Sequence, residues 1–399
     1  MNITVHEVEK LLKGNQTFSQ LGFSMLLEQM KIVYAKDPSS VNLQKCANEI
    51  NAFLTKFSAI MAADYESIAS SQTAERTSHV LTFDETAELI HNGKLLHIAG
   101  TETLLRMLPR GNWIGGSTEY FMASDGGMIS DELLFVTEFP YDVFFMKSYD
   151  ASDICDVGVD AFEYGFSILI VPFDSEVHKV YAENATGYAH MFIKHVTGWV
   201  AGVNLEKPGQ KPVVINGISG KAFSDKAVAL HLDIPDRKTI HINIINIFEQ
   251  DMDSPVIEFR EEGFSITKCL VGGTETILAD YIEQNAIDTK LPLVGDYSGN
   301  GVNISFKSIE NGIVNLYAPV FSGVKYRMAK KIPDYAEAFQ SHISKIDAEN
   351  SVFSCNCILN FLYGELEGKK IEKFNGPITF GEIAYQLVNQ TLVYVTIDD

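Results

Sequence analysis

Two cysteines separated by one residue, Cys355 and Cys357, stand where we expect a helix to begin and to continue to Leu366. Successive helical residues turn by about 100°, so the two thiols would diverge by about 200° and would not bind one metal ion together. Packing is therefore the simplest role for Cys357. Cys355 differs because a thiol in the first helical turn feels the helix dipole and ionises more easily. An ionised Cys355 could contact a ligand or act as a nucleophile.

Acidic, amide and hydroxyl side chains follow these cysteines. Glu382 comes directly after Gly381, and Asn389 and Thr391 lie two residues apart before an apolar strand, so both would face one side of it. A buried carboxylate needs a partner, which for Glu382 could be backbone amides, a lysine or a ligand amine. With Cys355, these groups could form a polar patch at a junction of sheet and helix. Alternatively, Glu382 caps a helix and Asn389 closes a turn.

Other motifs lack a residue that their chemistry requires. The glycine-rich segment 108–121 has no lysine after its last glycine, so we interpret it as a tight turn around Trp113 rather than a phosphate site. Residues 296–301 resemble the start of a calcium loop, but the twelfth position is Lys307 instead of a glutamate. The histidine spacings do not match a zinc-binding helix. A haem iron needs only one histidine, which spacing cannot reveal, so the cofactor stays unknown with haem as one candidate.

The charge of the chain argues against two classes of partner. Acidic residues number 52 and basic residues 31, which gives a formal net charge of −21 at pH 7. Such a field repels phosphates and anionic lipids, so we expect neither nucleic-acid binding nor a role at a membrane. The start, MNITVHEVEK, does not resemble a signal peptide. Five cysteines in a long chain fit a reducing compartment, so we expect a cytoplasmic protein.

The elements that must position these residues fall into three predicted regions. In residues 1–75, apolar residues recur at steps of three and four, which predicts an N-terminal helical hairpin that packs within the chain or forms a homodimer. From residue 79 on, short β-rich runs alternate with turns, and helices are expected at 83–91 and 334–343. We predict an α+β fold, with mixed sheets and flanking helices, whose parts 79–250 and 251–399 are candidates for two related halves.

The last fifty residues resemble a known family. A helix that starts with a cysteine, a turn carrying the residues from Phe380 to Ile383, and the residues from Asn389 to Leu392 before a terminal strand are similar to the C-terminal FIST domain. From residue 82 on, the chain also resembles an uncharacterised bacterial family of FIST-related proteins. The resemblance implies two FIST-like halves. It also implies a sensory protein that binds a small ligand and signals this to a partner protein. Amino acids have been suggested as ligands of such domains.

The resemblance also implies which residues bind the ligand. The matched positions are Cys355, Gly381, Glu382, Asn389 and Thr391. The FIST domain has an arginine soon after the cysteine, and this chain has none there. The residues that take its place and complete the predicted ligand site are Asn356 and Asn360.

Three functions follow from these observations. The first is a ligand-binding sensory module, which the C-terminal motifs favour. The second is a cysteine-dependent enzyme that uses Cys355 as nucleophile with Glu382 or a histidine as base. The third is an interaction protein that assembles through its N-terminal helices.

Overall fold

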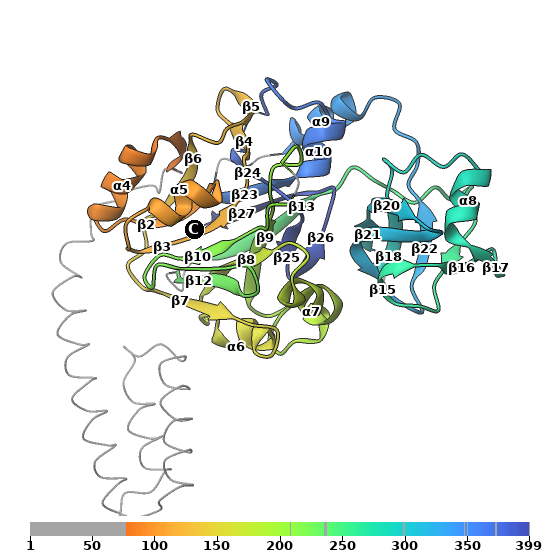
Figure 1. Cartoon of the computed structure of the whole chain (residues 1–399), viewed down its shortest axis with the longest axis horizontal. Helices are drawn as coiled ribbons and strands as arrows, with labels where there is room; N and C mark the ends of the chain where they lie inside the picture. Colours follow the sequence, from red (N-terminus) through yellow and green to blue (C-terminus); the bar gives the residue numbers. More distant parts are fainter. Residues whose placement is uncertain are drawn as a thin grey trace, which may run out of the picture. The chain divides into compact units, whose positions relative to one another are not determined.

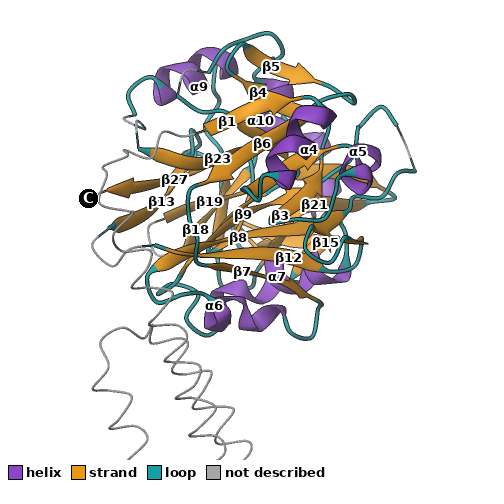
Figure 2. Cartoon of the chain, turned by 90° about the vertical axis from the view of Figure 1, so that its left-hand side faces the viewer, coloured by secondary structure: helices purple, strands orange, loops and turns teal. Residues whose placement is uncertain are grey.

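Strands make up most of the regular structure in the computed structural model, which describes residues 77–398 apart from 208, 235–237, 298–299, 347, 349 and 372. The described strands form five sheets, which Figure 2 shows in orange. Residues 76–399 belong to one compact unit. We name each sheet after one of its strands.

The β2 sheet contains a parallel pair, β2 and β3, which the short helix α5 connects. Its strands in spatial order are β1 (Thr77–Leu81), β6 (Leu134–Phe139), β2 (Leu95–Gly100), β3 (Trp113–Ser117), β10 (Val214–Asn216) and β11 (Lys221–Phe223). The helices α4 (Phe83–His91) and α5 (Glu102–Met107) cover one face, where Ile90 and Leu105 pack on Trp113 (Figure 1). α4 begins where it does because Thr82 and Glu85 cap its first turn reciprocally.

The β8 sheet is buried on both faces. Its strands in spatial order are β26 (Gln386–Val388), β25 (Glu382–Ala384), β9 (His195–Ala201), β8 (Gly165–Pro172), β12 (Ala227–Asp233) and β7 (Phe144–Tyr149). In β8, Phe166 and Ile168 face a core shared with two other sheets, whereas Leu169 and Val171 pack in a second core with α7 (Glu176–Asn184). Burial on both sides explains why this strand is continuously apolar instead of alternating. The second core also holds α6 (Val157–Asp160) and the 3-10 turns η1 (Ile154–Asp156) and η2 (Ala185–Gly187).

The β23 sheet combines strands from distant parts of the sequence. Its strands in spatial order are β13 (Thr239–Ile245), β27 (Leu392–Asp398), β23 (Ser351–Cys357), β24 (Gly376–Thr379), β4 (Tyr120–Ala123) and β5 (Gly126–Ile129). Phe353, Cys355 and Val393 contribute to the core shared with the β2 and β8 sheets. The helix α10 (Ile358–Tyr363) follows β23 directly, and α9 (Tyr335–Ile343) precedes it.

Two further sheets lie in the segment between residues 257 and 328. The β18 sheet consists of β17 (Thr274–Ile277), β16 (Lys268–Val271), β14 (Ile257–Glu258), β22 (Lys325–Met328), β18 (Leu293–Tyr297) and β19 (Asn300–Ile304). The β21 sheet consists of β15 (Gly263–Ile266), β21 (Ile313–Val320) and β20 (Phe306–Glu310). The helix α8 (Leu278–Gln284) packs against them through Leu278 and Ile282.

The predicted fold class is wrong. Sheets dominate, and none of the described helices exceeds nine residues, so helices are minor covers and not half of an α+β architecture. The predicted N-terminal helical hairpin lies outside the described residues. Two related halves are not the organising feature either, because the β8 and β23 sheets each pair strands from before residue 250 with strands from after residue 350. The boundaries 1–75, 79–250 and 251–399 stay a prediction.

Individual helices were predicted with mixed success. The helices expected at 83–91 and 334–343 are confirmed as α4 and α9, the latter capped by Asp334. The helix expected from Cys355 to Leu366 is wrong in its first part, because β23 continues to Cys357 and α10 begins only at Ile358. β23 is a central strand held between β27 and β24, and this tertiary pairing overrides the helical pattern of the apolar residues.

Candidate functional site

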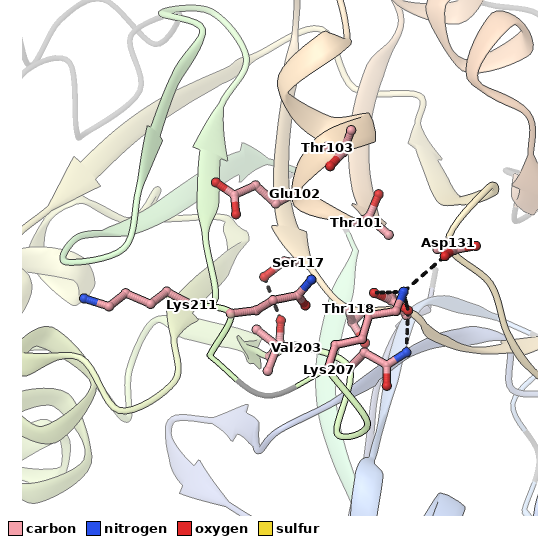
Figure 3. Close-up of a pocket in the computed structure, with 13 residues that line it drawn as sticks. Thr101, Glu102, Thr103, Ser117, Thr118, Asp131, Val203, Lys207 and Lys211 are labelled. Atoms are coloured by element: carbon pink, nitrogen blue, oxygen red, sulfur yellow. Dashed lines mark hydrogen bonds and ion pairs between the residues drawn. The ribbon is translucent and has the colours of Figure 1, made fainter.

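A cavity of about 320 Å³ lies at the ends of three strands, β2, β3 and β9 (Figure 3). Its lining residues are Thr101, Glu102, Thr103, Ser117, Thr118, Glu119, Asp131, Gly202, Val203, Asn204, Lys207, Gln210 and Lys211. β2 is parallel to β3, and β9 is parallel to β8. Ligand sites commonly form outside the carboxyl ends of parallel strands, because the segments that leave the sheet diverge there.

Two backbone segments close the inner wall of this cavity. The amide of Gly202 donates to the carbonyl of Ser117 at 2.8 Å, and Oγ of Ser117 donates to the carbonyl of Gly202 at 2.7 Å. A Cβ at position 202 would lie 1.8 Å from the ring of Phe380, so glycine is needed for this close approach. The β2 and β8 sheets are thereby joined at the cavity.

The buried carboxylate of Glu119 is the strongest polar feature of the cavity. Its Oε2 accepts from Nδ2 of Asn204 at 2.6 Å and from Nζ of Lys207 at 3.0 Å. Nζ of Lys207 also donates to Oδ2 of Asp131 at 3.1 Å. Hydrogen bonds to Glu119 and Asp131 raise the pKa of Lys207, and the hydrogen bond from Lys207 lowers the pKa of Asp131. The lysine is therefore held charged between two carboxylates.

The lining is polar, carries both signs of charge and contains no aromatic side chain. Oε1 of Glu102 pairs with Nε of Arg106 at 2.7 Å along α5. This ion pair offsets part of the negative charge that Glu102 brings to the cavity. Lys211 is exposed, and the described residues include no acidic partner for it. Such a lining suits a small polar molecule and gives no platform on which a flat ring could stack.

The predicted residue Glu382 lies in β25, away from the cavity and fully buried. Its Oε1 accepts from Oγ1 of Thr379 at 2.7 Å, and its Oε2 accepts from Oγ1 of Thr391 at 2.8 Å. Burial raises the pKa of Glu382 to about 8, and these hydrogen bonds only partly oppose the shift. The carboxyl group is therefore largely protonated at neutral pH.

Asn356 and Asn360 extend this polar cluster on the other side of the β23 sheet. Nδ2 of Asn360 donates to Oδ1 of Asn356 at 2.8 Å and to the carbonyl of Thr391 at 3.0 Å. The hydroxyl of Tyr335 donates to Oδ1 of Asn360. Nδ2 of Asn356 has no hydrogen-bond partner among the described residues. All of these side chains except Tyr335 are almost fully buried.

Asn389 bonds to a different segment. Its Oδ1 accepts from the amide of Ser305 at 3.1 Å and from the hydroxyl of the same residue. Gly381 has a φ of +148°, which favours glycine, and its carbonyl accepts from the amide of Val200 at 2.8 Å. The structure thus brings Glu382, Thr391, Asn356 and Asn360 into one network and places Asn389 at its border.

Cys355 does not lie in a first helical turn, contrary to our expectation. It lies within β23, where its Sγ contacts the carbonyl of Gly198 at 3.4 Å. Burial raises the pKa of Cys355 and of Cys357 well above the ordinary thiol value. Both thiols are almost fully buried, so the reason for expecting a reactive thiolate at Cys355 is lost.

The cavity and the buried network are connected in space. Oγ1 of Thr118, in the cavity lining, donates to the carbonyl of Ile378 at 2.8 Å. The next residue, Thr379, bonds to Glu382. Ile378 and Thr379 therefore connect the cavity wall to Glu382, and the lining itself was missed from the sequence.

Part of the lining was visible in the sequence but was interpreted differently. Ser117, Thr118 and Glu119 belong to segment 108–121, for which the sequence predicts a tight turn around Trp113. In the structure, this segment forms β3 and the start of β4. The useful signal was the succession of β2, α5 and β3, which predicts a parallel pair and hence a site at its carboxyl end.

Two features are absent from the part of the chain that the structure describes. They contain no group of three His, Cys, Asp or Glu side chains placed to hold a metal ion. Among the described helices, none combines the length and the apolar character that a membrane span requires.

Comparison with known proteins identifies a family for most of the chain. A family model matches residues 81–398, and its description reads "Family of unknown function (DUF6976)". A search of curated proteins found no match.

Proposed function

Because the chain belongs to the DUF6976 family, whose function is unknown, we propose a function from the site itself: this protein binds a small polar molecule in the cavity at the ends of β2, β3 and β9. The cavity volume of about 320 Å³ carries the proposal, since ligand cavities in proteins commonly measure roughly 300 to 1,000 Å³.

The chemistry of the lining supports a polar ligand. Hydroxyls of Thr101 and Thr103, the amide of Gln210 and the charges of Glu119 and Lys211 offer donors and acceptors, and Val203 is the single large apolar side chain. A mainly apolar ligand would bury these groups without partners, which is unfavourable.

The resemblance to FIST domains supports the same type of function. It suggests amino acids as the ligand class and a sensory role, in which a partner protein in the cytoplasm responds to occupancy. We extend the proposal to that role. The network around Glu382 would act in it as a rigid support behind the cavity wall, because Thr118 and Thr379 connect the two regions.

A binding screen with a cavity-filling variant tests the proposal. The purified protein is titrated calorimetrically with the twenty amino acids, small dicarboxylates and small amines. Val203→Phe fills the cavity and is expected to abolish binding of any compound that the wild type binds. Leu205→Phe is the matched control, because Leu205 lies two residues away, is 47% exposed and does not line the cavity. Binding that both variants retain would refute the cavity as the site.

A further inference from the structure

Lys207 lies where the cation of a ligand would also fit. Its Nζ is 3.0 Å from Oε2 of Glu119, 3.2 Å from Oε1 of Glu119 and 3.1 Å from Oδ2 of Asp131 (Figure 3). We call Glu119 and Asp131 the acid pair. Two carboxylates face one ammonium group here, so the acid pair keeps an excess of negative charge that a second cation would offset.

The two sides of this contact are not equally fixed. The side chain of Glu119 is 7% exposed, and Nδ2 of Asn204 donates to its Oε2 at 2.6 Å. The side chain of Lys207 is 42% exposed and long. Ion pairs between an exposed lysine and a carboxylate contribute little to stability, because solvent screens the charges and the side chains lose conformational freedom when they pair. Glu119 is thus a preformed acceptor, and Lys207 is the part that can leave.

We propose that the acid pair is an ammonium subsite, where a primary amine of the ligand binds in competition with Lys207. The inference rests on the proposed function and adds the chemical class of the ligand, a small molecule with a protonated amino group. The rest of the molecule then lies along Ser117 and Val203, which Figure 3 shows between Asp131 and Lys211.

Three probes of similar size test the charge preference. Butylammonium, butyrate and n-butanol are titrated at constant ionic strength, and binding is followed by NMR chemical-shift changes. We expect butylammonium alone to bind, and to bind Lys207→Met at least about tenfold more tightly than the wild type, since the competing cation is gone.

Lys211→Met is the matched control. It removes the same charge from the same cavity but leaves the acid pair occupied by Lys207, so its affinity for butylammonium should change by less than about threefold. An equal gain in butylammonium affinity in Lys207→Met and Lys211→Met would overturn the inference. It would indicate only a change in the electrostatic potential of the whole cavity.

Variants of the acid pair complete the test. Asp131→Asn, at a side chain that is 61% exposed, should weaken butylammonium binding several-fold in the Lys207→Met background without affecting folding. Glu119→Gln should abolish butylammonium binding in the same background. Unchanged binding in Asp131→Asn would contradict the inference.

The proposed function can survive the failure of this inference. A ligand without an amine that Val203→Phe blocks would support the cavity and overturn the ammonium subsite. Binding of butylammonium that is insensitive to Val203→Phe would instead refute the cavity.

Discussion

The hydroxyl of Thr391 donates to Oε2 of Glu382 at 2.8 Å, although both side chains are buried and nine residues apart in sequence. Thr379 makes the equivalent bond to Oε1 at 2.7 Å. Two neutral hydroxyl donors hold the carboxyl group, and it forms no ion pair with any of the described residues. Its protonation state is therefore set mainly by burial, which has a measurable consequence for stability.

Glu382→Gln should change how stability depends on pH. The pKa of Glu382 is raised to about 8 in the folded protein, so its contribution is fully present below the unfolded value near 4.5 and is lost as pH rises toward 8. Between pH 5 and 8, the wild type should lose about 4 kcal/mol of unfolding free energy relative to the variant. Urea unfolding at pH 5, 6.5 and 8 measures the difference. If the unfolding free energies of the two proteins change with pH in parallel, Glu382 is not a neutral acid in the folded protein.

Cys355 and Glu382 illustrate how far the sequence could predict this site. The patterns pointed to polar groups of the last fifty residues, and the structure connects Glu382, Thr391, Asn356 and Asn360 in one network, whereas Cys355 and Asn389 bond to other segments. The patterns could not predict that Cys355 lies in a strand, since its pairing with Val393 of β27 is a distant contact. The same limit explains the missed cavity, whose walls come from residues 101–103, 117–119 and 202–204. Apolar runs predicted sheets well, but not which strands pair.

His178→Leu should not destabilise the protein at neutral pH and is expected to raise stability by about 1 kcal/mol. The ring of His178 is buried between Phe173 and Phe264, and neither of its nitrogens has a hydrogen-bond partner among the described residues. Leucine has a similar volume and removes the unpaired polar atoms. Urea unfolding at pH 7.5 measures the change, and a loss above about 2 kcal/mol would show that the ring makes a contact that leucine cannot replace.

The same variant should be less sensitive to acid. Burial lowers the pKa of His178 to about 4, below the unfolded value of 6.5, so the stability that comes from its neutral form is present above pH 6.5 and is lost as pH falls toward 4. At pH 5 this loss amounts to about 2 kcal/mol in the wild type and is absent in His178→Leu. An identical loss in both proteins between pH 7.5 and 5 would contradict the burial of a neutral ring.

Gly202→Ala should destabilise the fold by about 2 kcal/mol, because the new Cβ would lie 1.8 Å from the ring of Phe380. Gly187→Ala is the control, since a Cβ there meets no atom within 4 Å, and its effect should stay within about 0.5 kcal/mol. In the Phe380→Leu background, Gly202→Ala should destabilise the fold less. A double-mutant cycle by urea unfolding should therefore give a coupling of about 1 kcal/mol, and strict additivity would show that the two residues do not meet.

Cys355 and Cys357 should resist alkylation in the native protein, whereas Cys155 should react. Both thiols of β23 are almost fully buried and burial raises their pKa, so the thiolate that attacks iodoacetamide is scarce and inaccessible. Cys155 is exposed and serves as the internal control. Peptide mass spectrometry after timed labelling at pH 7.5 should show at least about tenfold slower modification at positions 355 and 357 than at 155, and equal rates for all three in urea. Rapid, selective labelling of Cys355 in the folded protein would restore the cysteine-dependent enzyme as an explanation.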